Sequence, residues 1–208
     1  MHRCNRLCEH ADETAPYHLK KGSDGMRVLV LASLLLPLGS RKITENKKDV
    51  FQSKAAVLHC LRWSMADADA IAHIISETSE LLAASGELAS PFDRITKDRL
   101  VLGRWIRTCK AWWPCVAALV ATRKTHDHER QCAQMLDDFC GHVHRWQLTR
   151  AYEMKPLLNG KEIIALGGKP GPSLGHLLEA LIEHQLQTEE TSKETAVAFM
   201  KSCIGKIE

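Results

Sequence analysis

Apolar residues recur three and four positions apart along most of this chain, which is the spacing of amphipathic α-helices. Polar, glycine-rich or proline-rich segments interrupt the pattern, so several separate helices are expected. No stretch alternates apolar and polar residues strongly enough to predict a strand, and the expected fold class is all-α. The predicted helices cover about residues 27–39, 51–61, 67–85, 96–114, 115–122, 129–150, 160–166, 173–186 and 192–204.

Capping residues predict where some of these helices begin and end. Asp49 and Asp67 precede two of the apolar patterns and are expected N-caps, because a short side-chain oxygen accepts the free amides of a first helical turn. Gly86 is expected to end the helix that begins near position 67. Thr191 and Glu194 have the spacing of a capping box in front of the last helix.

The apolar run at 27–39, "RVLVLASLLLPLG", is too short to cross a membrane. It has about a dozen uninterrupted apolar residues, whereas a spanning helix needs about 20. The preceding segment contains acids such as Glu9 and Asp12, which fit the basic leader of a signal peptide poorly. We therefore expect a buried helix here, after an irregular or disordered lead-in at residues 1–25.

The stretch at 96–114, "TKDRLVLGRWIRTCKAWWP", divides into two faces on a helical wheel. Its apolar arc holds three tryptophans, which are expected to belong to the core rather than to stack on bases. Between positions 94 and 124 there are eight Lys or Arg residues and a single acid, Asp98. Such one-sided charge suits a polyanion such as an RNA backbone, although a solvated surface explains it equally well. The polar arc, which also includes Gly103, consists of Arg99, Arg104, Arg107 and Lys110.

A glycine- and proline-rich corner separates two helical patterns between positions 160 and 186. Gly167 and Gly168 are expected to end the first helix, and the prolines at 170 and 172 to stiffen the turn before the second. Backbone amides at the start of the second helix, beside Lys161 and Lys169, would suit a phosphate, as in helix-hairpin-helix nucleic-acid binders. The alternative is that the glycines only allow two helices to pack closely.

Two other groups of residues suggest chemistry but have simpler explanations. Asp67 and Asp69 have the spacing of a two-metal carboxylate pair, yet they stand where a helix begins and acids are favoured. Cys132 and Cys140 lie on the apolar stripe of one helix, near His142 and His144, without the C-x-x-C spacing of a zinc site. We therefore expect no metal ligands and no cofactor in this chain.

The composition of the chain predicts its cellular compartment but does not identify a binding partner. The 208 residues are 45% apolar and 25% charged, with a formal net charge of +3, which is ordinary for a globular protein. The eight cysteines are scattered through helical patterns rather than arranged as a disulfide framework. This distribution predicts a reducing, intracellular compartment, which includes the cytoplasm, the nucleus and the mitochondrion.

Four motifs in sequence order resemble the C-terminal part of the eukaryotic CCA-adding tRNA nucleotidyltransferases, particularly plant and fungal members. The first two resemble the family's "ASLFLPL" helix and its later "KASDAE" segment, and the third its Gly-x-x-Ile/Leu-Arg helix that precedes a tryptophan. The fourth is the most specific, with Lys-Pro, Gly-Lys-Glu-Ile and Gly-Pro in order. They are "VLASLLLPL" (30–38), "SMADADAIAHI" (64–74), "DRLVLGRWIRTCKAWWPCVAAL" (98–119) and "MKPLLNGKEIIALGGKPGPSLGHLLEALIEHQL" (154–186).

The resemblance implies the helical body (26–150) and tail (151–208) of a class II enzyme that adds C, C and A to tRNA 3′ ends. The family's α/β catalytic head, with its Asp-x-Asp pair for magnesium, matches no position here. No residue of this chain is therefore assigned a catalytic role. We expect an inactive tRNA-binding portion, whose Mg²⁺ would come only with a head that is encoded upstream or on another polypeptide. Arg107 and Lys161 are the candidate contacts that fall on family motifs.

Two alternatives remain open at this stage. The chain could be a stand-alone helical module that binds nucleic-acid duplexes through the corner at 167–172. It could also be a structural helical protein whose basic residues serve only solubility.

Overall fold

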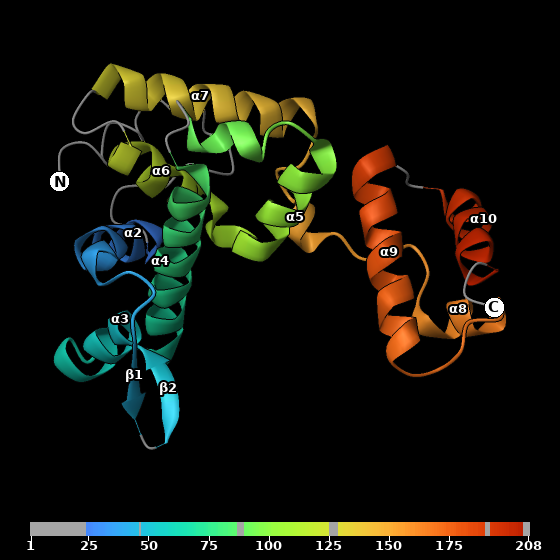
Figure 1. Cartoon of the computed structure of the whole chain (residues 1–208), viewed down its shortest axis with the longest axis horizontal. Coiled ribbons are helices and arrows are strands. Elements are labelled where there is room, and N and C mark those ends of the chain that lie inside the picture. The colour runs from blue at the N-terminus through green and yellow to red at the C-terminus, as the bar shows by residue number, and fades with distance from the viewer. Residues whose placement is uncertain (1–23, 46, 87–89, 125–128, 190–191, 206–208) are drawn as a thin grey trace.

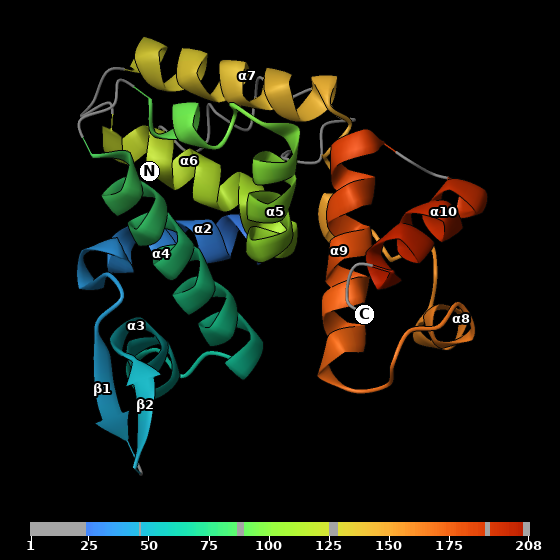
Figure 2. The ribbon, with the colours of Figure 1, turned by 45° about the vertical axis from the view of Figure 1, so that its right-hand side comes forward.

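The computed structural model describes residues 24–45, 47–86, 90–124, 129–189 and 192–205. About 75% of these residues are helical, and the one sheet found among them has two strands, so the expected all-α class is confirmed. The lead-in expected at residues 1–25 lies almost entirely outside the described part of the chain. Figures 1 and 2 show α7 along one end of a group of helices, a β-hairpin at the opposite end, and three further helices, α8 to α10, to one side.

The apolar run near the N-terminus forms the expected buried helix. Helix α2 (Asp24–Leu35) continues into a 3₁₀ turn, η1 (Leu36–Leu38), and packs against α4 (Met65–Ser85). Val28, Leu29 and Ala32 of α2 are almost completely buried. Within the described ranges, no helix is both long enough and apolar enough to span a membrane.

A β-hairpin follows α2 and corrects the prediction that no strand is present. Strands β1 (Lys42–Glu45) and β2 (Lys48–Phe51) are antiparallel, with Ile43 opposite Val50 and Glu45 opposite Lys48. Asp49 is therefore a strand residue and not an N-cap, and its carboxylate accepts a hydrogen bond from Thr44 Oγ1 at 3.1 Å. The chain then forms α3 (Gln52–Ala55) and a π-helical turn, η2 (Ala56–Cys60).

Helix α4 begins one turn before the predicted cap. Ser64 is the N-cap, and its Oγ accepts the Asp67 amide at 3.1 Å and donates to the Asp67 carboxylate at 2.8 Å. The role predicted for Asp67 thus belongs to Ser64. Gly86, with φ +53°, ends the helix as expected.

The stretch expected as one helix at 96–114 is broken. After η3 (Pro91–Arg94), Asp98 caps α5 (Arg99–Cys109), which ends at Lys110, whose φ is +56°. The 3₁₀ turn η4 (Lys110–Trp112) redirects the chain into α6 (Trp113–Lys124). Because of this break, Trp112 and Trp113 do not continue the α5 face. Helix α7 (Glu129–Arg145) stops five residues before the predicted end.

The described residues after 150 contain the predicted helical corner. A 3₁₀ turn, η5 (Ala151–Glu153), leads to α8 (Gly160–Ala165). Asn159 and Glu162 form a full capping box at the N-terminus of α8. Helix α9 (Pro172–Thr188) begins at the expected proline. Ser192 caps α10 (Lys193–Ile204) through the Glu194 amide, so the capping-box prediction is corrected by one position. Thr191 itself lies outside the described residues.

Buried apolar side chains form two clusters. The larger one runs through α2 to α7 and is centred on residues such as Ile71, Ile106 and Phe139. The smaller one joins α8, α9 and α10 through Ile163, Leu181 and neighbouring residues. Leu186 of α9 belongs to the larger cluster, so α9 links the two. The division into body and tail at residue 150 stays a prediction.

Candidate nucleic-acid interface

Helix α5 carries three of the six predicted contact residues, with a fourth, Lys110, at its C-cap, and its polar arc faces helix α9. Gly103 is buried in this contact, and a Cβ atom added to it would lie 2.8 Å from Leu186 Cδ2. The missing side chain therefore lets the two helices approach closely. What the helical wheel suggested as an open basic surface is in large part a helix–helix contact.

Arg99 is the most enclosed of the four cations. Its side chain is 14% exposed, and Nη2 donates to the Trp146 carbonyl at 3.1 Å. Nε lies 3.1 Å from Glu189 Oε1, an ion pair whose geometry falls short of a hydrogen bond, and Nη1 is buried without an acceptor among the described residues. Burial lowers the pKa of Arg99, and the nearby Glu189 carboxylate opposes that shift.

Arg107 also points inward. Nη1 donates to the carbonyls of Ala151 and Met154, each at 2.8 Å, and the side chain is half-buried. These carbonyls belong to η5 and the residue after it, where the chain leaves the larger cluster for α8. Arg107 therefore ties α5 to the beginning of the tail segment, and these bonds give it a structural role whether or not it meets RNA.

Arg104 and Lys110 are exposed. Arg104 pairs with Glu183 of α9, and both side chains are about half exposed, so solvent screens the pair. Lys110 stands at the left-handed residue that ends α5, and no ion pair of its ammonium group is found within the described ranges. These two residues keep the access to solvent that an RNA contact requires.

Two further cations of the basic segment at 94–124 also bind backbone carbonyls. Arg94 donates to the Ala84 carbonyl at 3.1 Å and Lys124 to the Gly86 carbonyl at 3.2 Å. Both carbonyls lie at the C-terminal end of α4, where a helix favours positive charge. Five of the eight cations in this segment thus have a partner within the protein, but only Arg99 and Arg107 make part-buried contacts.

The corner between α8 and α9 has the predicted geometry. Gly167 and Gly171 have φ values of +107° and +121°, and a Cβ on Gly168 would lie 2.9 Å from the Ile163 carbonyl oxygen. Lys161, in the first turn of α8, and Lys169, in the turn, are both exposed. The glycines are thus needed for close packing, and the two lysines remain open to solvent.

The six predicted residues do not form one surface. The corner precedes Pro172, whereas the α5 contacts fall on the last two turns of α9. Glu183 follows Pro172 by eleven positions, or about 16 Å along the helix axis. Arg104, at Glu183 near the end of α9, is therefore separate from Lys161 and Lys169 at the corner, and Lys110 lies at the end of α5.

The paired carboxylates have cationic partners. Arg27 Nη2 lies 3.2 Å from both carboxylate oxygens of Asp67, which also accepts the Ser64 hydroxyl, and Asp69 lies 2.5 Å from Lys54 Nζ. Both acids stand in the first turns of α4, where the helix dipole favours them. In the described part of the chain, no group of three or more His, Cys, Asp or Glu side chains is arranged to hold a metal ion.

The cysteines and tryptophans lie where the sequence predicted. Cys132 and Cys140 of α7 are buried in the larger cluster, and burial raises the pKa of the Cys140 thiol from 9.0 to about 12. Trp113 is buried, and its Nε1 donates to the Thr149 carbonyl at 3.2 Å. Trp105 packs edge-on against Phe139 at 5.6 Å between ring centroids.

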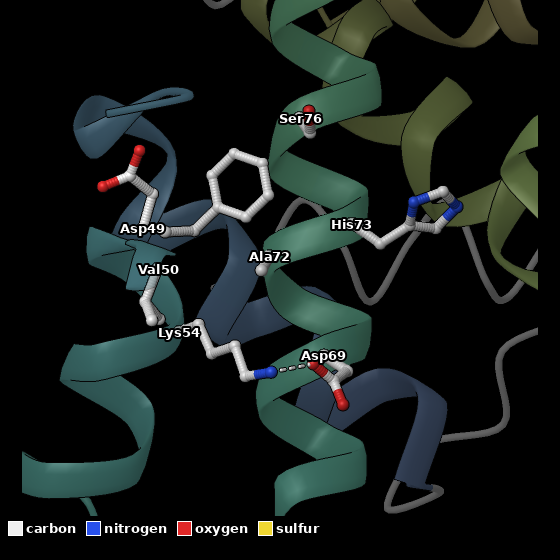
Figure 3. A pocket seen from close by; sticks show the side chains of 8 residues that line it. Asp49, Val50, Lys54, Asp69, Ala72, His73 and Ser76 are labelled. Carbon is white, nitrogen blue, oxygen red and sulfur yellow. Dashed lines mark ion pairs between the residues drawn. The ribbon is translucent and has the colours of Figure 1, made fainter. Parts of the chain in front are cut away.

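A shallow pocket of about 300 Å³ lies between β2, α3 and α4 (Figure 3). The Lys54–Asp69 ion pair occupies one side, and the His73 side chain points away from β2, where its Nε2 lies 3.0 Å from the Thr108 carbonyl oxygen. Asp49 accepts the bond from Thr44. The polar groups of this pocket already have partners, so it is a weaker candidate than the basic surfaces.

Sequence reasoning missed the basic β-hairpin. Arg41, Lys42, Lys47 and Lys48 are all exposed on it or at its base. The available signal was the sequence "RKITENKK" (41–48), in which β-branched residues precede an asparagine, a residue common in tight turns.

Comparison with known proteins relates the chain to one class of enzymes. It is 45% identical over 56 residues to tRNA nucleotidyltransferase cca2 of Schizosaccharomyces pombe, covering 26% of this chain and 12% of that protein. It is 29% identical over 119 residues to the CC-adding tRNA nucleotidyltransferase of Thermus thermophilus, covering 56% and 26%. It is 24% identical over 191 residues to the mitochondrial CCA tRNA nucleotidyltransferase of Saccharomyces cerevisiae, covering 85% and 34%.

No protein-family model and no solved structure matches the chain. The chain spans 12 to 34% of the length of these curated relatives. Its similarity is therefore to parts of CCA- and CC-adding tRNA nucleotidyltransferases.

Proposed function

We propose that this chain is the tRNA-binding body and tail of a CCA-adding tRNA nucleotidyltransferase and that it does not transfer nucleotides by itself. The observation that carries the proposal is similarity to several tRNA nucleotidyltransferases, which extends over 85% of the chain in one of them. The helical fold and the exposed cations at two ends of α9 support binding to a folded polyanion.

The contacts are proposed to fall on the phosphodiester backbone of the acceptor stem and elbow. Lys110, with Arg104, would meet one stretch of this backbone, and Lys161 with Lys169 another. Contacts of this kind recognise charge and shape rather than base sequence. Arg99 and Arg107 would act indirectly, by holding the tail against α5.

The lack of transfer activity is inferred from the residues that would have to perform it. The Asp-x-Asp sequence in this chain is Asp67-Ala68-Asp69 on α4, and its acids pair with Arg27 of α2 and Lys54 of α3. Catalysis would then need a separate polypeptide or segment that carries the carboxylates and their Mg²⁺. Where in the cell this happens stays a prediction.

Equilibrium binding of the 208-residue chain to tRNA tests the proposal. The variant combines Lys110→Asn, Lys161→Glu and Lys169→Glu. Asparagine tolerates the left-handed conformation at 110, and an acid in the first turn of α8 is compatible with the helix dipole. We expect affinity to fall about tenfold or more at low salt, since phosphate contacts dominate such binding. A wild-type chain that does not retain tRNA would contradict the proposal.

Two further measurements separate the alternatives. Preference for duplex DNA over tRNA in a competition assay would favour a stand-alone duplex-binding module instead. Incorporation of labelled CMP or AMP into tRNA that lacks its 3′ end, by the purified chain alone, would contradict the proposed division between binding and catalysis.

A further inference from the structure

The β-hairpin lies in a second basic segment of this protein, besides the one at 94–124. Residues 41–62 contain six Lys or Arg residues and two acids, which gives this segment a formal charge of +4, whereas the whole chain carries +3. The rest of the chain is therefore close to neutral in sum. The six cations are Arg41, Lys42, Lys47, Lys48, Lys54 and Arg62.

The acids of the segment have partners, and Lys42 Nζ lies 5.3 Å from the centroid of the Phe51 ring, whereas three other cations have no such contact among the described residues. Glu45 lies 3.2 Å from His59 Nε2, and Asp49 accepts the Thr44 hydroxyl at 3.1 Å. Arg41, Lys47 and Lys48 are exposed, and no ion pair of theirs is found among the residues that the structure describes. Their charge is thus directed to solvent, unlike that of Arg99 or Arg107.

The hairpin also projects from the molecule. In Figures 1 and 2 strands β1 and β2 extend away from the helices, at the end of the larger cluster opposite α7, and a turn at Lys47 leads into β2. Lys47, in that turn, has a φ of +65°, a conformation in which glycine or asparagine is far less strained than lysine. The turn therefore places a lysine where its backbone is unfavourable and its side chain is exposed.

We propose that the β1–β2 hairpin is a further contact surface for the phosphodiester backbone of a folded RNA. This inference rests on the proposed function and extends it from the tail to the opposite side of the larger cluster. A two-stranded hairpin with a cationic turn presents its charges at one edge, where a phosphate strand can approach without meeting the helices. An RNA large enough to reach both regions would bind through both.

Another role for exposed lysines on a short hairpin is to prevent edge-to-edge association of strands. The two roles make different predictions. In edge protection the lysines repel the strands of a second copy of the chain and have no effect on RNA binding. A phosphate contact instead contributes to the salt dependence of RNA binding.

The test compares two triple variants of the full chain. The hairpin variant is Arg41→Gln, Lys47→Asn and Lys48→Gln, in which asparagine suits the positive φ at 47. The control is Arg123→Gln, Arg130→Gln and Arg145→Gln, which removes the same charge from exposed residues of α6 and α7 at the other end of the cluster. The dissociation constant for tRNA is measured between about 50 and 200 mM salt, and each contact contributes about 0.7 to 0.9 to the slope of log affinity against log salt.

We expect the hairpin variant to have a slope smaller by about 2, so that the wild type loses roughly 16-fold more affinity over this fourfold salt range. The control slope should stay close to that of the wild type. Equal slopes for the hairpin variant and the wild type, or equal decreases in both variants, would overturn the hairpin proposal while leaving tRNA binding intact. Failure of the wild type to bind tRNA would instead overturn the proposed function, and the hairpin proposal with it.

A second measurement uses the unaltered chain, so it does not depend on how the variants fold. Lysine acylation is followed by mass spectrometry with and without tRNA. We expect Lys47 and Lys48 to be protected by tRNA at low salt and to react at the free-chain rate at high salt. Unchanged reactivity of both lysines in the complex would contradict the proposal.

Discussion

Arg107 connects α5 to the segment that leads into the tail, and Arg107→Met isolates this role. Methionine keeps most of the apolar stem and removes the guanidinium group. Two bonds to carbonyls are lost, each 2.8 Å long. Hydrogen bonds with a charged donor contribute about 1.5 to 3 kcal/mol each, and the lower value applies to a half-buried side chain, so about 3 kcal/mol of unfolding free energy is lost.

Urea unfolding followed by circular dichroism measures this loss. With an m-value of about 2 kcal/mol per molar, the midpoint should fall by about 1.5 M. Arg145→Met is the matched control, because Arg145 is exposed on α7, and it should change the unfolding free energy by no more than about 0.5 kcal/mol. A wild-type midpoint for Arg107→Met, together with weaker tRNA binding, would refute the structural role and make Arg107 an RNA contact.

Three other predictions follow from single contacts. Gly103→Ala should destabilise the fold by about 1 kcal/mol in urea unfolding, because overpacking against Leu186 exceeds the gain in helix propensity, and it should become stabilising when Leu186 is Ala. Burial holds the Cys140 thiol neutral in the folded state, so stability is complete below about pH 9 and declines toward pH 12; Cys140→Ala should flatten that decline. The hydrogen bond from Lys193, and then the backbone of Asn159, lowers the pKa of Glu162; Lys193→Met should raise this pKa in a carboxyl NMR titration, and an unchanged value would contradict the bond.

Local sequence signals predicted the α8–α9 corner well. Asn159 and Glu162 specify a capping box within four residues, and the glycines and Pro172 restrict the turn that follows. Each of these effects depends on neighbouring residues alone. The break at Lys110 has no such signal, and the turn at Lys47 has only the preceding asparagine, because both positions hold a lysine where a positive φ would suggest glycine.

The basic arc of α5 was harder to interpret, because its partners are distant in sequence. Arg99 meets Trp146 and Glu189, which are 47 and 90 positions away. A helical wheel separates charged from apolar residues but does not show that a charged face packs on another helix. Gly103 was the available signal, because glycine inside a helix costs about 1 kcal/mol relative to alanine and is often retained for close packing.

Footprinting of tRNA by hydroxyl radicals, in complex with the 208-residue chain, tests the central claim most directly. The proposed function predicts protection of the sugar-phosphate backbone along the acceptor stem and elbow, with no protection in the anticodon stem. Protection confined to the anticodon stem, or a cleavage pattern identical to that of free tRNA, would contradict it.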